Sequence, residues 1–440
     1  MPRHRRSWEA ATAALMVLML ALTPRPAAGQ GADVAKGAEE RARGVELHGK
    51  GDFSGAVAAF TEAIRLNPKD AVAYYDRAAA WAEVPAADKA LADYDEALKL
   101  DPKLAPAYVG RGRLRAAAGD VDAAVADYTR AIEADPKDPL APFARAQAEA
   151  SRRGYDKALA DYDRAINLAP SNALFHLSRG DVRRAKGDLA GAAEDFSRAL
   201  RLDPRLADAY DARAAVAFGQ GRHLDALDDF GRALKLAPGD ARAHLGRATC
   251  LFELHEYDLA ASAYGKALEI DPAMADAFYG RGRALAQKGE YDRAAADYDE
   301  ALKLAPGHPS ARTGRGIVRL LQGRFADAVA DLDAAVGRDP DDAVATTHLA
   351  RLLAACPDDK LRDGARAKAL AEKARALTRE SEPFALAAMA AADAELGRFP
   401  SAAAWQEMAL GLSRDPEAKA RARARLALYR KGQPLRDPTP

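Results

Sequence analysis

The sequence predicts an all-α protein: a right-handed superhelical solenoid of stacked antiparallel helix pairs that ends in a capping helix. Three observations predict it. Prolines recur every 34 residues, nine times in succession, from Pro68 to Pro340. Small and aromatic residues recur at fixed places within this period. Apolar residues make up 49% of the chain, and much of that share is alanine, a strong helix former. A repeat of this length is typical of arrays in which each unit buries its apolar face against its neighbours.

The first 29 residues have the three-part pattern of a secretory signal peptide. A basic start that includes Arg5 precedes the apolar run 10–22, and Gly29 is a small residue suited to cleavage. The run has 13 residues, whereas a membrane-spanning helix needs roughly 20. We therefore expect residues 1–29 to be removed on export to the periplasm or medium, and residues 30–36 to form a short linker. The alternative is an uncleaved membrane anchor.

Nine units of 34 residues cover 37–340 if each recurring proline is numbered position 32. Position 8 is always Gly or Ala, and positions 20 and 27 are always Ala. Position 24 is large, as Tyr94 is in the second unit. Positions 20, 24 and 27 lie on one helical face. Small residues let two helices approach closely, and the large side chain fills the remaining space. Each unit is therefore predicted to be a helix, a turn and a second helix.

The turns between helices have their own signals. Position 15 is usually Gly, as in Gly51, which ends the first helix in a left-handed conformation. The proline at position 32 ends the second helix. Three units depart from the pattern: one has Pro85 at this point, one has its glycine at Gly154, and one has His255. We expect these three turns to differ in shape.

This combination of period, small positions, aromatic position and terminal proline resembles the tetratricopeptide repeat, and the resemblance covers residues 37–340. The spelling LARLLAACPDDKLRDG, followed by AELGRF and WQEMAL, is similar to the C-terminal part of bacterial members of the family. The resemblance implies a solenoid whose first helices line a concave binding groove.

Past Pro340 the strict period ends. Residues 341–415 are predicted to form two divergent units, the first with a longer loop at Cys356–Gly364. Residues 416–431 form a single Arg-rich helix, which a solenoid needs to cap its exposed end. Residues 432–440 are expected to be a disordered tail.

One pattern goes beyond the usual repeat. Position 7 is Arg in all nine units, and position 23 is Asp in seven. Both adjoin packing positions, so we predict a structural ladder of partly buried, bidentate Arg–Asp pairs. The alternative is a row of ligand-binding arginines. The sequence leaves open whether each Asp belongs to the same unit or to its neighbour. The pairs are Arg77 and Asp93, Arg111 and Asp127, Arg145 and Asp161, Arg179 and Asp195, Arg213 and Asp229, Arg281 and Asp297, and Arg315 and Asp331.

Partner-binding residues follow from the resemblance, which implies that positions 2, 5, 9 and 12 point into the concave groove. Aromatic and arginine side chains are favoured anchors at such surfaces. The family's clamp for chaperone tails needs Asn and Lys there, but the chain has three Asn and none lies on this face. The distinctive occupants are Tyr75, Arg113, Phe143, Gln147, Asp181, Arg184, Asp211, Phe252, Tyr279 and Arg283.

Enzymatic motifs are not found in the sequence. The G-x-G at Gly110–Gly112 falls inside a first helix and is explained by packing, and the eight histidines show no metal-ligand spacing. The acidic pair Asp93 and Asp95 recurs with the repeat, as a scaffold feature does. Lys and Arg together equal Asp and Glu at 65 each, so no nucleic-acid partner is indicated. We expect no cofactor, and two buried, unpaired cysteines.

These observations favour a non-enzymatic scaffold that binds a peptide or helix of a protein partner in an exported compartment. The first alternative is an accessory or adaptor subunit of an envelope protease or cell-wall machine. A remote alternative is an enzyme that uses the C-terminal segment Cys356–Gly364.

Overall fold

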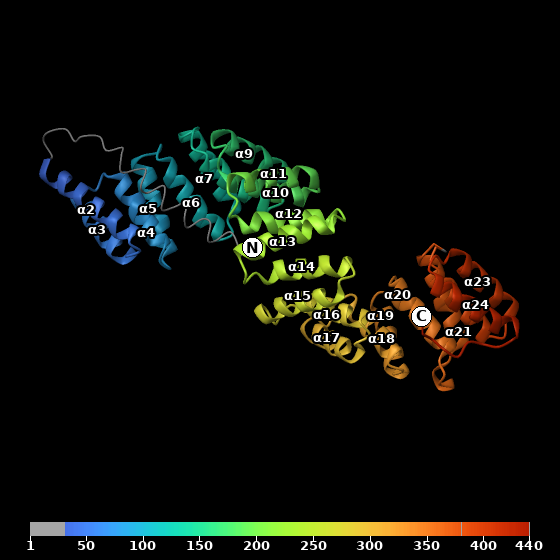
Figure 1. The fold of residues 1–440 in the computed structure, drawn as a ribbon. Helices are drawn as coiled ribbons and strands as arrows, with labels where there is room; N and C mark the ends of the chain where they lie inside the picture. The colour runs from blue at the N-terminus through green and yellow to red at the C-terminus, as the bar shows by residue number, and fades with distance from the viewer. Residues whose placement is uncertain (1–30, 380, 440) are drawn as a thin grey trace. The chain divides into compact units, whose positions relative to one another are not determined.

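The computed structural model describes residues 31–379 and 381–439 (Figure 1). Over this part of the chain it contains 23 α-helices, α2 to α24, and one short 3-10 helix. Consecutive helices pack as antiparallel pairs. This confirms the predicted all-α array of helix pairs. The predicted signal peptide, residues 1–29, lies outside the described residues.

The chain divides into two compact units, and the division falls inside α12, between Val216 and Ala217. We call them the N-terminal and C-terminal units. The helices up to the division are α2 (Gly31–Gly49), α3 (Phe53–Leu66), α4 (Ala71–Ala82), α5 (Ala87–Leu100), α6 (Ala105–Ala117), α7 (Val121–Ala134), α8 (Leu140–Ser151), α9 (Tyr155–Leu168), α10 (Ala173–Lys186), α11 (Leu189–Leu202) and α12 (Ala207–Gly219).

The C-terminal unit continues the same alternation of helices and short turns. Its helices are α13 (His223–Leu236), α14 (Ala241–Glu253), α15 (Tyr257–Ile270), α16 (Ala275–Gln287), α17 (Tyr291–Leu304), α18 (Ala311–Leu321), α19 (Phe325–Arg338), α20 (Ala343–Ala355), η1 (Asp359–Leu361), α21 (Gly364–Leu377), α22 (Pro383–Glu395), α23 (Phe399–Leu412) and α24 (Pro416–Arg430).

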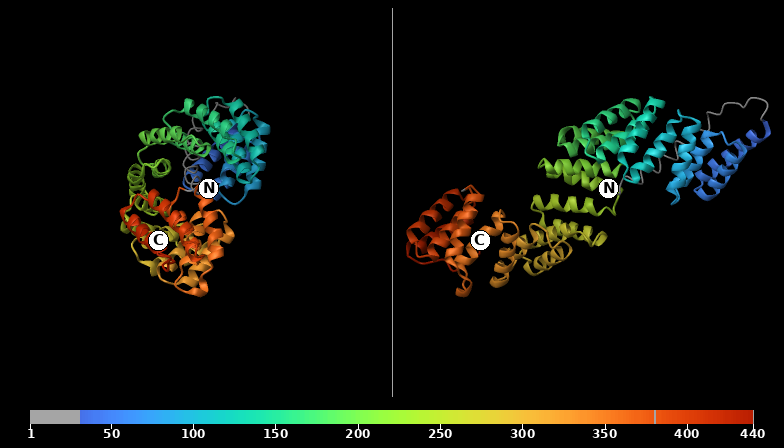
Figure 2. Two further views of the ribbon diagram at one scale, coloured as in Figure 1. Left: turned by 90° about the vertical axis from the view of Figure 1, so that its right-hand side faces the viewer. Right: turned by 180° about the vertical axis from the view of Figure 1, so that it is seen from behind.

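Even-numbered helices from α2 to α22 are the first helices of their pairs, and odd-numbered helices are the second. Within each unit, second helices pack against their own first helix and against the first helix of the next pair, as α5 does with α4 and α6. First helices of consecutive pairs also touch, as α4 touches α6 and α16 touches α18. Within each unit the helices thus follow one another in chain order (Figures 1 and 2). The surface formed by positions 2, 5, 9 and 12 of the first helices is called the first-helix face below.

The seam between paired helices is formed by the small residue at position 8 and the large residue at position 24. A Cβ atom added to Gly112 would lie 2.7 Å from the Tyr128 ring, and one on Gly180 would lie 2.6 Å from Phe196. A Cβ on Gly110, at position 6, would lie 2.5 Å from Tyr94 of the preceding repeat. Each ring therefore fills space left by small residues in its own repeat and in the next. Packing accounts for the recurring G-x-G.

A residue in the left-handed conformation ends the first helix of most repeats. All six glycines at position 15 have positive φ, for example Gly119 at 88°. Arg153 (φ 64°) and His255 (φ 63°) occupy the same position and keep the same conformation. The expectation that these two turns differ in shape is therefore wrong, because the packing of the flanking helices fixes the turn and a side chain accepts the strain. In the repeat with Pro85, none of the described residues 83–86 has a positive φ.

The last helices are followed by a segment that is placed against them. Residues 433–439 run without helix, and Leu435 and Pro438 are buried. Leu435 packs in a cluster with Tyr429 of α24 and with alanines of α20, α22 and α23. Arg436 Nη1 donates to Glu395 at 2.6 Å. The sequence led us to expect a disordered tail over 432–440, whereas the structure places the described residues 432–439 against the last helices through two apolar side chains and an ion pair. We call residues 433–439 the strap.

Cys250 and Cys356 are free thiols and both are fully buried. Within residues 31–379 and 381–439, none of the helices combines the length and the apolar character needed to cross a bilayer.

Candidate functional site

The arginine at position 7 binds the aspartate at position 23 of its own repeat. Arg77 Nε and Nη2 donate to Asp93 Oδ2 and Oδ1, both at 2.7 Å. The same two-bond geometry joins Arg111 to Asp127, Arg145 to Asp161, Arg179 to Asp195, Arg281 to Asp297 and Arg315 to Asp331, at 2.6 to 2.9 Å. The sequence left open whether the aspartate belongs to the same repeat as the arginine or to a neighbouring one. In each of these pairs, both residues belong to the same repeat.

A third bond then reaches into the preceding repeat. Arg111 Nη1 donates to Asp95 at 2.6 Å, and Arg145 Nη1 donates to Thr129 at 3.0 Å. Both acceptors are at position 25. The same link joins Arg77 to Thr61, Arg179 to Asp163, Arg213 to Ser197 and Arg315 to Asp299. This bond was not predicted from the sequence, although the polar residue that recurs at position 25 was its signal. In each acidic pair, the carboxylate at position 23 accepts from the arginine of its own repeat, and the carboxylate at position 25 accepts from the arginine of the next repeat.

The electrostatics suit a structural role. The hydrogen bonds that Arg145 donates to Asp161 raise the pKa of Arg145, and those that Arg281 donates to Asp297 raise the pKa of Arg281, because each carboxylate favours the charged guanidinium. Arg247 provides an internal comparison. Its repeat has Ala263 at position 23 in place of Asp, and this arginine is exposed. Because these guanidinium N–H groups already donate to acceptors of the protein itself, they favour a structural ladder over a row of ligand-binding arginines. The pair Arg213 and Asp229 spans the two units and stays a prediction.

Three predicted partner-binding residues come together on the first-helix face of the C-terminal unit. The Arg283 guanidinium lies 4.1 Å from the ring centre of Phe252 and 5.8 Å from that of Tyr279. The Tyr279 ring lies 4.6 Å from the His308 ring, centre to centre. Phe252 is on α14, Tyr279 and Arg283 are on α16, and His308 follows α17. We call Phe252, Tyr279 and Arg283 the aromatic–arginine cluster.

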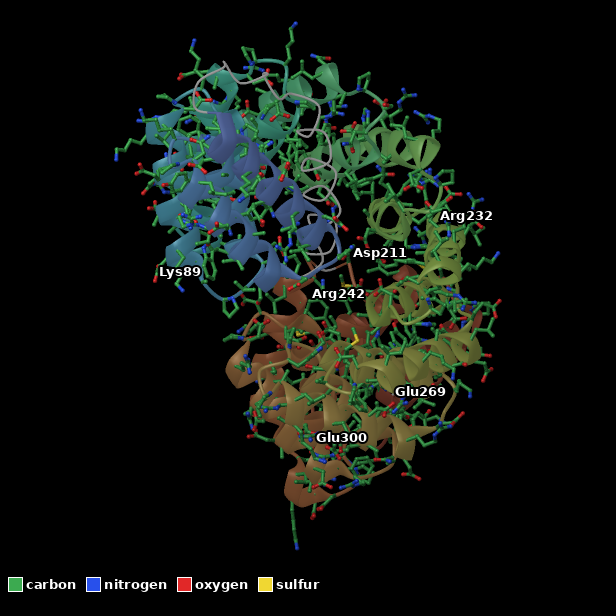
Figure 3. The ribbon with its side chains drawn as sticks, turned by 90° about the vertical axis from the view of Figure 1, so that its left-hand side faces the viewer. Lys89, Asp211, Arg232, Arg242, Glu269 and Glu300 are labelled. Atoms are coloured by element: carbon green, nitrogen blue, oxygen red, sulfur yellow. The ribbon has the colours of Figure 1, made fainter. Side chains whose placement is uncertain are left out.

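Arg283 differs from the ladder arginines in its partners. Within the described residues it forms no salt bridge and no hydrogen bond, and it is half-buried between two rings. Second helices of the same unit instead carry exposed charged side chains, such as Arg232 and Glu269 (Figure 3). The cluster can therefore offer an unsatisfied planar cation beside apolar ring surface.

In the N-terminal unit the predicted aromatic residues are mostly part of the packing. The Phe143 ring stacks on Phe175 at 4.6 Å and meets Tyr162 edge-on at 5.7 Å. Tyr75 is buried beside Tyr94, with ring centres 6.1 Å apart. These rings pack against one another within a repeat or, for Phe143 and Phe175, between neighbouring repeats, so less of their surface is left for a partner than the sequence pattern suggested.

The other predicted residues are dispersed. Arg184 is exposed and pairs with Asp181 one turn away at 3.0 Å. Arg113 and Asp211 are half-buried. The Oε1 atom of Gln147 is buried without a hydrogen-bond partner among the described residues. The structure thus brings together Phe252, Tyr279 and Arg283, and does not gather the rest into one site.

One conspicuous residue was missed by sequence reasoning. Arg351, on α20, is 1% exposed, although arginines are rarely buried without a charged partner. Its signal was an arginine within the otherwise apolar run HLARLLAA. Among the described residues, no group of three or more His, Cys, Asp or Glu is placed to hold a metal ion.

Comparison with known proteins agrees with this architecture. The sequence profile of the tetratricopeptide repeat matches eight segments that together cover residues 41–207 and 212–356. Among curated proteins no match is found. The chain is similar to the crystal structure of YrrB, described as a TPR protein with an unusual peptide-binding site, at 30% identity over 42% of this chain and 95% of that one, with a TM-score of 0.38.

Two further solved structures are similar to the chain. The pilF protein of Pseudomonas aeruginosa is 20% identical over 48% of this chain and 96% of its own, with a TM-score of 0.44. Yeast Tom70 is 18% identical over 90% of this chain and 96% of its own, with a TM-score of 0.37. The profile matches more than half of the residues, and the helix pairs have the family's 34-residue period. The chain belongs to the tetratricopeptide repeat family.

Proposed function

We propose that the protein is a non-enzymatic scaffold that binds an extended peptide or a helix of a protein partner on the first-helix face, at the aromatic–arginine cluster of α14 and α16. The TPR fold is a scaffold for protein–protein and peptide binding. The proposal adds the place and the chemistry of recognition. An acidic or carbonyl-rich segment with an apolar side chain would suit a planar cation held between two rings.

The observation that carries the proposal is the state of Arg283. A half-buried guanidinium without a salt bridge retains its full donor capacity and is partly desolvated already. A carboxylate or backbone carbonyl that reaches it forms a charge-assisted hydrogen bond, and the partner's apolar groups can cover Phe252 and Tyr279. The stacked rings hold the guanidinium in place, so binding requires little ordering of the scaffold.

A selection followed by affinity measurement tests the site. Random twelve-residue peptides displayed on phage would be selected on the full chain, and the best binders measured by fluorescence anisotropy. We expect Tyr279→Ala with Arg283→Ala to weaken binding at least about tenfold, as loss of two hot-spot residues does. The matched control is Arg293→Ala, which removes an exposed arginine from α17. Selected peptides that bind the double variant as tightly as the unchanged chain would argue against the site.

We also propose that the protein is exported and acts in the bacterial periplasm or medium. The support is the basic, apolar and small-residue pattern of residues 1–29. Mass spectrometry of the chain recovered from a periplasmic fraction tests it. A mature N-terminus near residue 30 is the expected result, and recovery of the uncut chain in the cytoplasm alone would contradict it.

A further inference from the structure

Arg351 is a buried cation with too few acceptors. Its Nη2 donates to the backbone carbonyl of Thr439, while its Nε and Nη1 are buried without any hydrogen-bond partner in the described residues. No carboxylate of the described chain forms a salt bridge with it. Its guanidinium lies 4.9 Å from the Phe384 ring centre. Burying such a charge without an anion is costly, so burial lowers the pKa of Arg351 to about 9.

A second arginine converges on the same atom. Arg425 of α24 donates from Nη2 to the Thr439 carbonyl at 3.1 Å. Tyr429, one helical turn further on, is 1% exposed, and its hydroxyl has no hydrogen-bond partner among the described residues either. His348, at the other side on α20, packs on Phe384, and burial lowers its pKa to about 4, so it is neutral near pH 7. Two guanidiniums thus donate to one neutral carbonyl oxygen, and the buried Tyr429 phenol lies within electrostatic reach of both of them.

The segment that packs against these groups is an extended stretch of the chain itself. The strap buries Leu435 and Pro438 and places Arg436 against Glu395. It then presents the Thr439 carbonyl to Arg351 and Arg425. Apolar anchors, one ion pair and one carbonyl contact are the kinds of contact by which a groove holds a bound peptide.

We propose that α20, α22 and α24 form a peptide-binding site whose specificity element is the Arg351–Arg425 pair, that its ligand is an extended segment presenting a carboxylate to this pair, and that the strap is an intramolecular occupant which the ligand displaces. The site shares no residue with the aromatic–arginine cluster, so either assignment can fail alone.

The ligand class follows from the groups against which the strap packs. Arg351, Arg425 and the Tyr429 hydroxyl all offer donors, and a neutral carbonyl accepts from two of them while leaving two Arg351 nitrogens unsatisfied. A carboxylate has two oxygens and a negative charge, and it matches the fork of a guanidinium. The pKa of Asp437 in the strap is lowered by hydrogen bonds from Thr439 and by the charges of Arg351 and Arg425. Its carboxylate accepts hydrogen bonds from Thr439, however, and not from the two arginines.

An experiment in the full chain tests the preference for an anion directly. Thr439→Asp puts a carboxylate on the residue whose backbone carbonyl contacts the two arginines, and Thr439→Asn is its neutral match. We expect the Asp variant to melt several degrees above the Asn variant, and expect Arg351→Met to abolish that difference. Equal melting temperatures of the two variants in the unchanged Arg351 background would overturn the anion preference.

A second experiment tests displacement. Leu435→Ser with Arg436→Glu, made in the full chain, removes one apolar anchor and the ion pair of the strap and leaves Arg351 and Arg425 in place. The probe is an amidated, fluorescent peptide with the sequence of residues 433–439 and Asp in the last position. A matched peptide has Asn in that position.

We expect the strap-released chain to bind the Asp peptide at least about tenfold more tightly than the unchanged chain does, and at least about tenfold more tightly than it binds the Asn peptide. Arg351→Met should remove the difference between the two peptides. Equal binding by released and unchanged chains, or no binding to either, would overturn the strap as an occupant. If circular dichroism shows that the released chain is unfolded, the comparison of Thr439→Asp with Thr439→Asn decides the proposal.

Discussion

Arg111 donates two hydrogen bonds to Asp127, at 2.6 and 2.9 Å, and uses its remaining terminal nitrogen to reach Asp95 of the preceding repeat. The pair is buried, and Asp127 also accepts from Arg115 at 2.9 Å. One side chain thus closes its own helix pair and ties that pair to the previous one. A solenoid has few contacts beyond nearest neighbours, so such ties hold adjacent repeats together.

Removal of Asp127 and removal of Asp95 should have different effects on the free energy of unfolding. Asp127→Ala leaves two cations near a buried seam, and removing one partner of a buried pair costs about 3–5 kcal/mol. Asp95 is 59% exposed, and an exposed ion pair is worth about 0–1 kcal/mol, so Asp95→Ala should cost little. Free energies of unfolding from urea titration measure both. Arg247→Ala, at an exposed position 7, is the control and should be nearly neutral. Equal losses for Asp127 and Asp95 variants would contradict the ladder's asymmetry.

The seam glycines make a second prediction. A Cβ on Gly110 would lie 2.5 Å from the Tyr94 ring, closer than atoms in contact ever come, so Gly110→Ala must displace the ring. Overpacking of this kind costs about 1–3 kcal/mol. Gly231→Ala on α13, where nothing lies within 4 Å, should instead stabilise by about 0.5–1 kcal/mol, because alanine is the better helix former. Thermal melting of the two variants should therefore shift in opposite directions.

Much of this architecture could be predicted because the same kinds of residue recur at the same positions in every repeat. The 34-residue period gives the helix pairs, and positions 7 and 23 give the Arg–Asp pairing. The third bond of Arg111 was missed because it joins positions in different repeats, and a periodic pattern does not say which neighbour a residue touches.

The first-helix face was harder to predict for a different reason. Residues there vary from repeat to repeat, and burial depends on the neighbouring ring, as it does for Phe143 against Phe175. Arg351 and the strap occur once and follow no period at all, so only the three-dimensional structure brings Thr439 beside an arginine that is 88 residues away in sequence.

The turn after α8 gives a third prediction. Arg153 has φ of 64° in a position that other repeats fill with glycine, and its side chain is exposed. A non-glycine residue in this region costs about 1–2 kcal/mol, so Arg153→Gly should stabilise the chain by about 1 kcal/mol. Gly119→Ala, in the same position of the preceding repeat, should destabilise it by a similar amount. If Arg153→Gly lowers the free energy of unfolding, the turn is not strained as described.

The last prediction concerns Asp76, a carboxyl on α4 that is 4% exposed. Burial raises its pKa to about 7, and Arg41 Nε, 3.9 Å away, only partly offsets this. In the unfolded chain the carboxyl ionises near pH 4. Between pH 4 and pH 7 the native state therefore binds more protons at this site than the unfolded state does. Stability contributed by this site must fall as pH rises through that window.

Asp76→Asn removes the titration and keeps the shape of the side chain. We expect the variant to be more stable than the unchanged chain at pH 8, by roughly 2–4 kcal/mol, because the unchanged chain must ionise a buried group there. Near pH 4, where Asp76 is protonated in the native state, the two proteins should be nearly equal. Unfolding free energies measured from pH 4 to pH 8 test this. A difference between the two proteins that stays constant over the range would show that Asp76 does not titrate within it.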